Sequence, residues 1–516
     1  SIFASNIGSE HLIGLAGAGA SSGMAMAHWE IQGWMILILG WVFVPFYTRS
    51  MVYTMPEFLE RRYNPQSRTI LSVISLVSYV LTKVAVTVYA GGLVFQQVFG
   101  IKELWGIDFF WIAAIGLVVL TALYTIFGGM KSVLYTSVLQ TPILLLGSLI
   151  ILVLGFKELG GWDEMMRVCG AVTVNDYGDT MTNLIRSNDD ANFPWLGALI
   201  GSAIIGFWYW CTDQFIVQRV LSGKNEMEAR RGTIFGAYLK LLPVFLFLIP
   251  GMIAFALHQK YIGAGGEGFL PMLANGTANA DAAFPTLVAK LLPAGVKGLV
   301  VCGILAALMS SLASLFNSSA MLFTIDFYKR FKPETPEKKL VGIGQIATIV
   351  IVVLGILWIP IMRSVGDVLY TYLQDVQSVL APGIAAAFLL GICWKRTSAQ
   401  GGMWGLISGM VIGLTRLGAK VYYSNAGEVA DSTFKYLFYD MNWLFFCGWM
   451  FLFCIIVVIV VSLATEAPTA EKIQGLVFGT ATKEQKAATR ASWNHWDIIH
   501  TVIILAITAA FYWYFW

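Results

Sequence analysis

Charged residues are scarce in this sequence. They make up 12% of its 516 residues, whereas soluble domains carry roughly 25%, and the mean hydropathy of +0.72 excludes a soluble globular protein. The 33 Lys and Arg nearly balance the 30 Asp and Glu, so neither a basic nucleic-acid-binding surface nor an acidic tail is present. The six cysteines form neither a disulfide framework nor a metal-ligand spacing. We therefore expect a protein that works within a lipid bilayer and binds no nucleic acid.

Apolar stretches of about 20 residues, the length that crosses a hydrocarbon core of about 30 Å, recur along the whole chain. We predict thirteen transmembrane segments. Their approximate ranges are 1–21, 25–48, 66–98, 106–127, 131–157, 193–220, 229–257, 284–328, 339–362, 367–394, 400–424, 437–465 and 494–516. The segment at 284–328 is too long for one perpendicular crossing, so we expect a short helix before Pro293 and a cytoplasmic extension at its end.

The distribution of Lys and Arg predicts the orientation. With the loop at 49–68 in the cytoplasm, twenty of the 33 Lys and Arg fall on that side and eleven on the other. Positive residues resist translocation, so this orientation is favoured, and it places the acidic loop at 158–192 and the C-terminus outside. Because Ser1 already lies in an apolar stretch without a charged region ahead of it, we expect the start of the first repeat to be truncated.

Six ionisable residues fall inside predicted membrane segments, where each costs at least about 2.5 to 3.5 kcal/mol unless it faces a cavity or a partner. One interpretation is a substrate or ion pathway, and the other is a structural ion pair or a charge that reaches the interface. The structural interpretation is stronger for the residues with fewer polar neighbours, Lys83 and Asp213. The six residues are Glu10, Glu30, Lys83, Asp213, Lys240 and Asp375.

Two segments have the pattern of interrupted helices. The first carries Gly8 between Asn6 and His11, and the second, five segments later, carries Gly206 followed by 209–214. Broken helices in corresponding positions of two halves are typical of inverted-repeat transporters with a binding site at mid-membrane. Glycine also permits close helix packing in membranes, so composition alone is an alternative explanation.

Adjacent hydroxyls at Ser310 and Ser311 stand among small residues in the eighth segment. Together with backbone carbonyls freed by an unwound first helix, they could replace the hydration shell of Na⁺. Packing by small residues is the alternative, and from these residues alone it is favoured.

Groups suited to a polyhydroxylated ring recur in the same segments. Such a ring needs hydrogen-bond partners for its hydroxyls and flat apolar surfaces for its C–H faces. The candidate polar groups are Asn6, His11, Glu30, Lys240, Gln374 and Asp375, and the candidate aromatic faces are Trp29, Tyr209, Trp210 and Tyr370. Aromatic residues near segment ends are more often an interfacial belt.

Six motifs in order resemble the solute:sodium symporters, and specifically their sodium-glucose and sodium-myo-inositol branch. They are SNIGSEHLIGLAGAGASSG, VYTMPEFLERRY, YWCTDQFIVQRVLSGKN, YLKLLPVFLFLIPGM, LMSSLASLFNSSAMLFTIDFY and PGIAAAFLLGICWKR. The resemblance implies an all-α polytopic membrane protein with the LeuT-type fold. We accordingly expect a first inverted repeat at 1–158, an outer loop at 159–192, a second inverted repeat at 193–394 and peripheral helices at 395–516.

The resemblance also implies the roles of individual residues. Na⁺ would be held by the backbone carbonyls of Ala4, Ile7 and Ala307 and the hydroxyls of Ser310 and Ser311. Sugar hydroxyls would be met by Asn6, Glu30, Lys240 and Gln374, with His11 nearby. Tyr209, beside Trp210, would stack under the ring as the inner gate, and Leu15, Trp29 and Tyr370 would close the site from outside.

Two departures from the family pattern bear on the number of ions. Ser137 follows Tyr135 and Thr136 where the sugar transporters have an aspartate, and Ala313 stands where members that couple two sodium ions carry a hydroxyl. Both favour one Na⁺ per sugar. The outer loops lack the cysteine-rich inserts of animal members, which suggests a bacterial inner membrane, and Asn275 begins a glycosylation sequon of a kind that chance also produces.

We therefore predict a sodium symporter that imports a hexose such as glucose or galactose by alternating access. A symporter for a polyol such as myo-inositol, or for another solute, is the first alternative. A membrane sugar sensor that does not transport is an alternative of another class, although no soluble signalling domain is attached. No nucleophile–base or metal-ligand constellation indicates an enzyme.

Overall fold

Residues 2–8, 10–52, 54–273, 276–365, 369–425 and 430–516 are described by the computed structural model of the chain, some only by their backbone. The first two predicted segments form a chain of short helical pieces. These pieces are α1 (Ile2–Asn6), η1 (Glu10–Leu15), α2 (Ala16–Ser22), η2 (Gly23–Met26), α3 (Ala27–Glu30), α4 (Gly33–Ile38), η3 (Leu39–Phe43) and α5 (Val44–Ser50).

The following part of the chain contains longer helices and one small hairpin. Its helices are α6 (Met55–Arg62), α7 (Pro65–Ser78), η4 (Tyr79–Val84), α8 (Ala85–Phe99), α9 (Phe109–Leu159) and α10 (Trp162–Gly170). Strands β1 (Glu103–Leu104) and β2 (Ile107–Asp108) pair antiparallel, with Glu103 opposite Asp108.

The sixth to tenth predicted segments follow the loop at 159–192. They comprise α11 (Trp195–Gly206), η5 (Phe207–Thr212), α12 (Gln214–Leu221), α13 (Glu226–Lys240), η6 (Val244–Leu248), α14 (Ile249–Gly263), η7 (Ala280–Ala282), α15 (Ala283–Leu291), α16 (Ala294–Met321), η8 (Leu322–Tyr328), α17 (Lys329–Phe331), α18 (Glu337–Val365) and α19 (Leu369–Cys393). The short helix expected before Pro293 is α15, which confirms that prediction.

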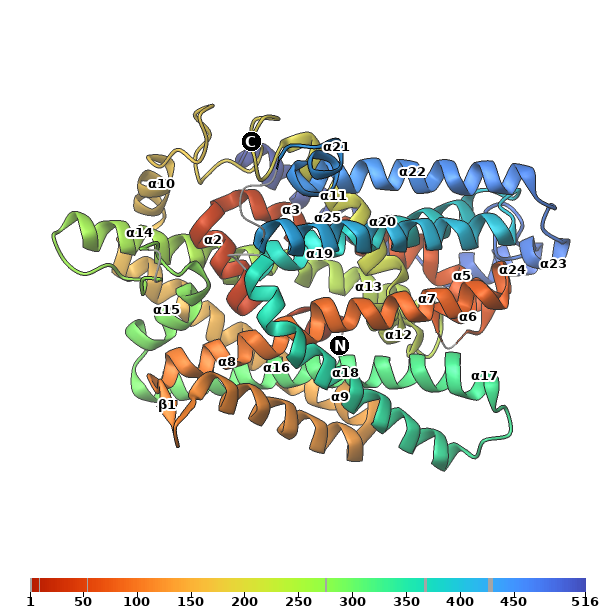
Figure 1. The fold of residues 1–516 in the computed structure, drawn as a ribbon, viewed down its shortest axis with the longest axis horizontal. Coiled ribbons are helices and arrows are strands. Elements are labelled where there is room, and N and C mark those ends of the chain that lie inside the picture. The colour runs from red at the N-terminus through yellow and green to blue at the C-terminus, as the bar shows by residue number, and fades with distance from the viewer. Residues whose placement is uncertain (1, 9, 53, 274–275, 366–368, 426–429) are drawn as a thin grey trace.

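The last part of the chain contains α20 (Ala399–Asn425), α21 (Thr433–Lys435), η9 (Tyr436–Asp440), α22 (Trp443–Ala464), α23 (Ala470–Ile473), α24 (Lys483–Ala491) and α25 (His495–Tyr514). Helices α19, α20 and α22 pack on one another, and α9 packs along α16. Figure 1 shows these two groups on opposite sides of the bundle, with α12 and α13 between them.

Within the described residues, ten helices are long and apolar enough to cross a membrane. They agree with most of the thirteen predicted segments and differ at three places. The first two predicted segments fall in one helical run, 10–50. The stretch 106–127 is described as a shorter apolar helix, Phe109–Leu123. Helix α20 is not apolar enough to be counted among the ten. The stretches at 106–127 and 131–157 both belong to the helical run α9.

Helix starts follow local signals. Thr54 accepts a hydrogen bond from the Glu57 amide at the start of α6, and Asn64 does the same for the Ser67 amide at the start of α7. In both helices a proline stands in the first turn, where its missing N–H costs no hydrogen bond. The chain can therefore turn sharply between membrane segments without leaving backbone groups unpaired.

The loops collect at the two ends of the bundle (Figure 1). At one end, the Leu184 amide donates to the carbonyl of Phe515 over 3.0 Å, so the loop at 159–192 contacts the end of α25. The same loop covers the turn at Gly23, whose φ of 66° favours glycine, because the Met24 amide donates to the Met181 carbonyl over 2.8 Å. Helices α6, α17, α23 and α24 lie at the other end.

Candidate functional site

Both predicted helix interruptions are present. The first lies between Asn6, the last residue of α1, and Glu10, the first of η1. The second is at Asp213, which has extended backbone angles between η5 and α12 and caps α12 through the Phe215 amide. Helix interruptions leave backbone groups available inside the bundle, which is where transporters place polar ligands.

A cavity lies between these two interruptions. Its wall contains eight of the predicted substrate-binding and gate residues, and elements η1, α3, η5, α13 and α19 contribute to it. These residues are Asn6, His11, Trp29, Tyr209, Trp210, Lys240, Tyr370 and Gln374. The space open to the centres of water molecules is about 40 Å³, which is room for a few waters at about 10 to 15 Å³ each.

Glu30 lies directly behind this wall and is fully buried. Lys240 Nζ donates to Glu30 Oε2 over 2.6 Å, and the Tyr370 hydroxyl donates to Glu30 Oε1 over 2.5 Å. His11 Nε2 is 3.4 Å from Glu30 Oε2. A buried carboxylate needs such partners because desolvation of an unpaired charge is costly.

Several polar atoms around the cavity have no hydrogen-bond partner among the described residues. They are Asn6 Oδ1, His11 Nδ1, Trp29 Nε1 and Gln374 Oε1, all buried. Most buried polar groups in proteins are paired, so each exception calls for an explanation. A ligand that supplies hydroxyl groups at this point would pair them.

Aromatic rings stand on two sides of the cavity. The Tyr209 hydroxyl accepts a hydrogen bond from Asn6 Nδ2 over 3.2 Å, and its ring meets that of Trp210 edge to face, with centroids 5.1 Å apart. Trp29 stacks on Trp443 with ring centroids 5.5 Å apart. These rings are apolar faces held in fixed positions, as packing of a sugar ring requires.

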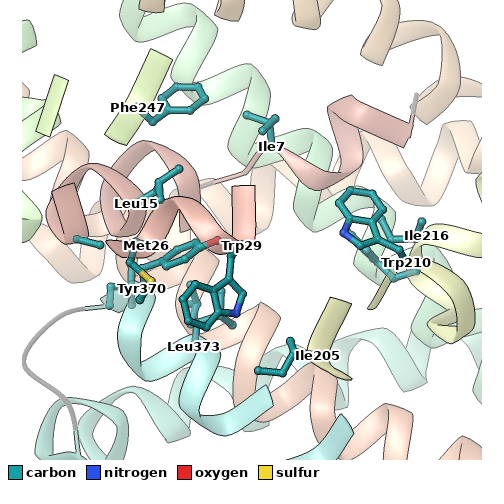
Figure 2. Packing of buried hydrophobic residues seen from close by; sticks show 14 of the residues in the cluster. Ile7, Leu15, Met26, Trp29, Ile205, Trp210, Ile216, Phe247, Tyr370 and Leu373 are labelled. Carbon is teal, nitrogen blue, oxygen red and sulfur yellow. The ribbon is translucent and has the colours of Figure 1, made fainter. Parts of the chain in front are cut away.

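The three residues predicted to close the site from outside gather around the start of α19. Figure 2 shows Leu15, Met26, Trp29, Tyr370 and Leu373 close together, with Trp210 apart from them. Leu15 is buried in η1 and packs within this apolar cluster, but it does not line the cavity itself. Trp29 and Tyr370 therefore form the wall, and Leu15 supports it.

The predicted cation site brings the first interruption against α16. A Cβ on Gly8 would lie 2.5 Å from Ser311 Oγ, so the absence of a side chain at Gly8 permits this close approach. Ser311 Oγ is buried and has no partner within the described part of the chain, as expected of a group that ligates an ion. Ile7 and Ala307 are buried nearby, in the interruption and one helical turn before Ser311.

Two of the predicted cation ligands are less well defined by the structure. Ala4 lies in α1, which contacts α16, but its side chain is outside the described residues. Ser310 is buried and already has a partner. Of the two hydroxyls, Ser311 is therefore the better candidate ligand.

A profile of the Sodium:solute symporter family matches residues 1–409. The chain belongs to this family. The human sodium/myo-inositol cotransporter 2 is 36% identical over 493 residues, which cover 93% of this chain and 72% of that protein. The sheep sodium/glucose cotransporter 1 is 38% identical over 484 residues, which cover 90% and 72%.

Solved structures share the fold. A Na⁺-coupled sialic acid symporter in a substrate-bound outward-open state matches with a TM-score of 0.69 at 21% identity, covering 91% of this chain and 89% of that chain. MhsT in complex with L-phenylalanine matches with a TM-score of 0.50 at 12% identity, covering 90% and 96%. The protein is therefore an all-helical, multi-pass sodium-coupled solute symporter with the LeuT-type fold, and not an enzyme.

The symporter's cavity also contains residues that the sequence interpretation did not assign to it. Glu10, Gln32, Leu373 and Gln377 line the wall. Gln377 and Leu373 could have been found, because they lie three residues from Gln374 and Tyr370 on the same face of α19. Gln32 approaches because Gly206 has no side chain there, since a Cβ on Gly206 would lie 2.5 Å from Gln32 Oε1.

One candidate sugar group lies elsewhere. Asp375 is not in the cavity wall, and its carboxylate pairs with Lys420 of α20. Adjacent residues of a helix point about 100° apart, so Gln374 faces the cavity while Asp375 faces α20. The side chains of Tyr135, Thr136 and Ser137, and residue Asn275, lie outside the described residues. Ala313 is buried in α16.

Proposed function

We propose that this symporter imports a neutral polyhydroxylated solute, most simply a hexose such as glucose or galactose, together with Na⁺. The observation that carries this proposal is the set of unpartnered polar atoms on His11, Asn6 and Gln374 around one small cavity. Aromatic faces at Tyr209 and Trp210 complete a lining of the kind that a sugar ring requires.

The charge of the lining favours a neutral solute. Lys240 is already paired with Glu30, and no arginine is among the residues described in the wall. A net-anionic solute would need an unpaired cation or an open helix N-terminus to offset its desolvation. A polyol such as myo-inositol meets the same requirements as a hexose, and one of the similar proteins is a sodium/myo-inositol cotransporter.

The cation would be held by the first interruption and α16. We assign the carbonyls of Ala4, Ile7 and Ala307 and the hydroxyls of Ser310 and Ser311 as its ligands. The unpartnered hydroxyl of Ser311 beside Gly8 supports this assignment. With Ala313 lacking a hydroxyl, one Na⁺ per sugar is the proposed stoichiometry.

Coupling follows from where these ligands lie. Na⁺ between the interrupted first helix and α16 would stabilise the outward-open arrangement, in which the sugar groups of α3 and α19 are accessible. Because Na⁺ would favour the state that binds sugar, each ligand would raise the affinity for the other. Entry of Na⁺ would then drive entry of sugar if only the doubly loaded protein rocks readily inward. At 100 mV one charge supplies about 2.3 kcal/mol, and a tenfold Na⁺ gradient adds about 1.4 kcal/mol.

The arrangement in the membrane is part of the proposal. Residues 1–158 and 193–394 would form the two inverted repeats, 159–192 the outer loop and 395–516 the peripheral helices. The end of the bundle that carries the 159–192 loop and the C-terminus would face outward, and the cell membrane would be that of a bacterium. The contact between Leu184 and Phe515 supports placing both on one side.

The deciding experiment is uptake into proteoliposomes of radiolabelled glucose, galactose and myo-inositol, with an inward Na⁺ gradient compared against K⁺. The expected result is a transient overshoot above equilibrium with Na⁺ only. Gln374→Ala should reduce it, whereas Gln345→Ala, on α18 and outside the cavity, should not. An absence of overshoot with all three solutes would contradict the proposed function.

A further inference from the structure

The two oxygens of Glu30 are divided between different partners. Oε2 faces Lys240 and His11, which belong to the cavity wall. Oε1 accepts its hydrogen bond from the hydroxyl of Tyr370, at 2.5 Å. Glu30 has no exposed surface, and Tyr370, the donor to Oε1, is a residue of the cavity wall.

Tyr370 is held in this place by its backbone as well as its hydroxyl. It is the second residue of α19, and a Cβ on Gly14 of η1 would lie 3.0 Å from the Tyr370 backbone nitrogen. The rings of Tyr370 and His11 meet edge to face with centroids 6.1 Å apart. The start of α19 thus packs closely against the interrupted first helix.

Tyr370 joins the cavity wall to Glu30, because it lines the cavity and donates to Glu30 Oε1. A substrate hydroxyl that bonds Oε1 from the cavity therefore meets the phenolic hydroxyl already in that position. A buried carboxylate oxygen without a donor is costly, so Oε1 needs one donor throughout, either the phenol or the substrate hydroxyl.

We propose that the Tyr370 hydroxyl holds the place of one substrate hydroxyl on Glu30 Oε1, so that the two exchange when substrate binds. This inference rests on the proposed function and identifies Tyr370 as a specificity-determining residue. A solute with a hydroxyl at the matching position replaces the phenolic donor. A solute without it leaves Tyr370 bonded to Glu30 and gains nothing from that oxygen.

The exchange makes the two hydroxyls competitors, which gives a signature beyond a change in activity. In Tyr370→Phe the ring remains, but Oε1 has no donor before substrate arrives. The matching substrate hydroxyl then displaces nothing, and the apparent KM of the complete solute should fall about tenfold. The KM of the deoxy analogue that lacks this hydroxyl should stay within about twofold of its value in the unaltered protein.

The experiment measures Na⁺-driven uptake of the transported solute and each of its monodeoxy analogues, in the unaltered protein and in Tyr370→Phe. For the analogue that lacks the matching hydroxyl, Tyr370→Phe should leave KM nearly unchanged. For the other analogues it should lower KM, as it does for the complete solute. Tyr209→Phe is the matched control, because its hydroxyl bonds Asn6 and not Glu30. The change in KM caused by Tyr209→Phe should be the same for the complete solute and for the analogue that lacks that hydroxyl.

The possible results distinguish a failure of the exchange from a failure of the proposed function. An equal KM change for all analogues would overturn the exchange, as would a weaker affinity for the complete solute in Tyr370→Phe. If the unaltered protein transports neither sugars nor polyols, the proposed function fails and the exchange with it. Should the variant reconstitute poorly, solute-induced thermal shifts of the purified protein in Na⁺ provide the same comparison.

Discussion

Two ion pairs lie beside two adjacent aromatic residues of η5, and their surroundings differ. Lys240 Nζ lies 5.5 Å from the ring centre of Trp210 and pairs with Glu30. Lys83 Nζ lies 5.0 Å from the ring centre of Tyr209 and pairs with Asp213. Both pairs lie beside aromatic residues of η5, and all four side chains are at most 10% exposed.

The difference lies in what completes each pair. Asp213 Oδ1 accepts from the Tyr79 hydroxyl over 2.9 Å and from the Phe215 amide over 3.2 Å, and Lys83 lies 3.9 Å from the ring centre of Phe215. This pair is enclosed by protein and joins η4 to the start of α12. Neither residue lines the cavity.

Around Lys240 and Glu30, by contrast, the neighbouring polar atoms lack partners and face a cavity. Satisfied neighbours indicate a structural role, because such a group has no capacity left for a ligand. Unsatisfied neighbours indicate a binding role. An ionisable residue in a membrane segment is therefore informative only together with its surroundings.

The largest expected effect tests the enclosed pair. Asp213→Asn keeps a cap for α12 but leaves the charge of Lys83 unpaired, so it should destabilise the protein by about 3 to 5 kcal/mol. A double variant that adds Lys83→Met should restore most of the thermal stability, measured as the midpoint of heat-induced unfolding in detergent. A fully stable Asp213→Asn protein that cannot transport would contradict the structural role of this pair and indicate a role in transport.

The open pair should lose transport even when no charge is left unpaired. Lys240→Met alone leaves the fully buried Glu30 carboxylate without its cation, so it should destabilise the protein as Asp213→Asn does. The double variant with Glu30→Gln should reconstitute, but its uptake efficiency should fall about 100-fold, since hydrogen bonds to charged groups are worth up to about 3 kcal/mol. Unaltered uptake by the double variant would make this pair structural too.

A smaller effect is expected at the cation site. Ser311→Ala should raise the Na⁺ concentration for half-maximal uptake about tenfold or more, because it removes one oxygen ligand. Ser319→Ala is the matched control, since Ser319 Oγ is also buried in α16 and unpartnered within the described residues. Equal sodium dependence in the two variants would remove Ser311 from the site.

The smallest effect concerns Asp281, which accepts hydrogen bonds from the Leu369 amide. Burial raises the pKa of this carboxyl from 3.8 to about 7. The folded protein therefore retains a proton that the unfolded chain releases above about pH 4, and stability falls as the pH rises toward 7. Asp281→Asn should raise the unfolding midpoint by roughly 2 °C at pH 8 and leave it unchanged near pH 4. An equal shift at both pH values would exclude titration of Asp281.

The sequence predicted the helix interruptions at Asn6–Glu10 and near Asp213, and the family, because local residue patterns and six motifs in order carry that information. Taken without the resemblance, the residue patterns left open which of the six ionisable residues bind a ligand and which form structural ion pairs. Asp375 shows why, since its neighbour Gln374 lines the cavity while Asp375 itself pairs with Lys420 of α20. Only the rotation of α19 within the bundle distinguishes them.

The membrane location, the helical fold and the interrupted segments follow from the sequence alone, because a chain in lipid must satisfy its backbone hydrogen bonds within each segment. The bond between Tyr370 and Glu30 joins residues 340 positions apart. No periodicity relates such residues, so their contact is decided by how α19 packs on the interrupted first helix. Tertiary packing also decided which buried charges are satisfied by protein and which are left facing the cavity.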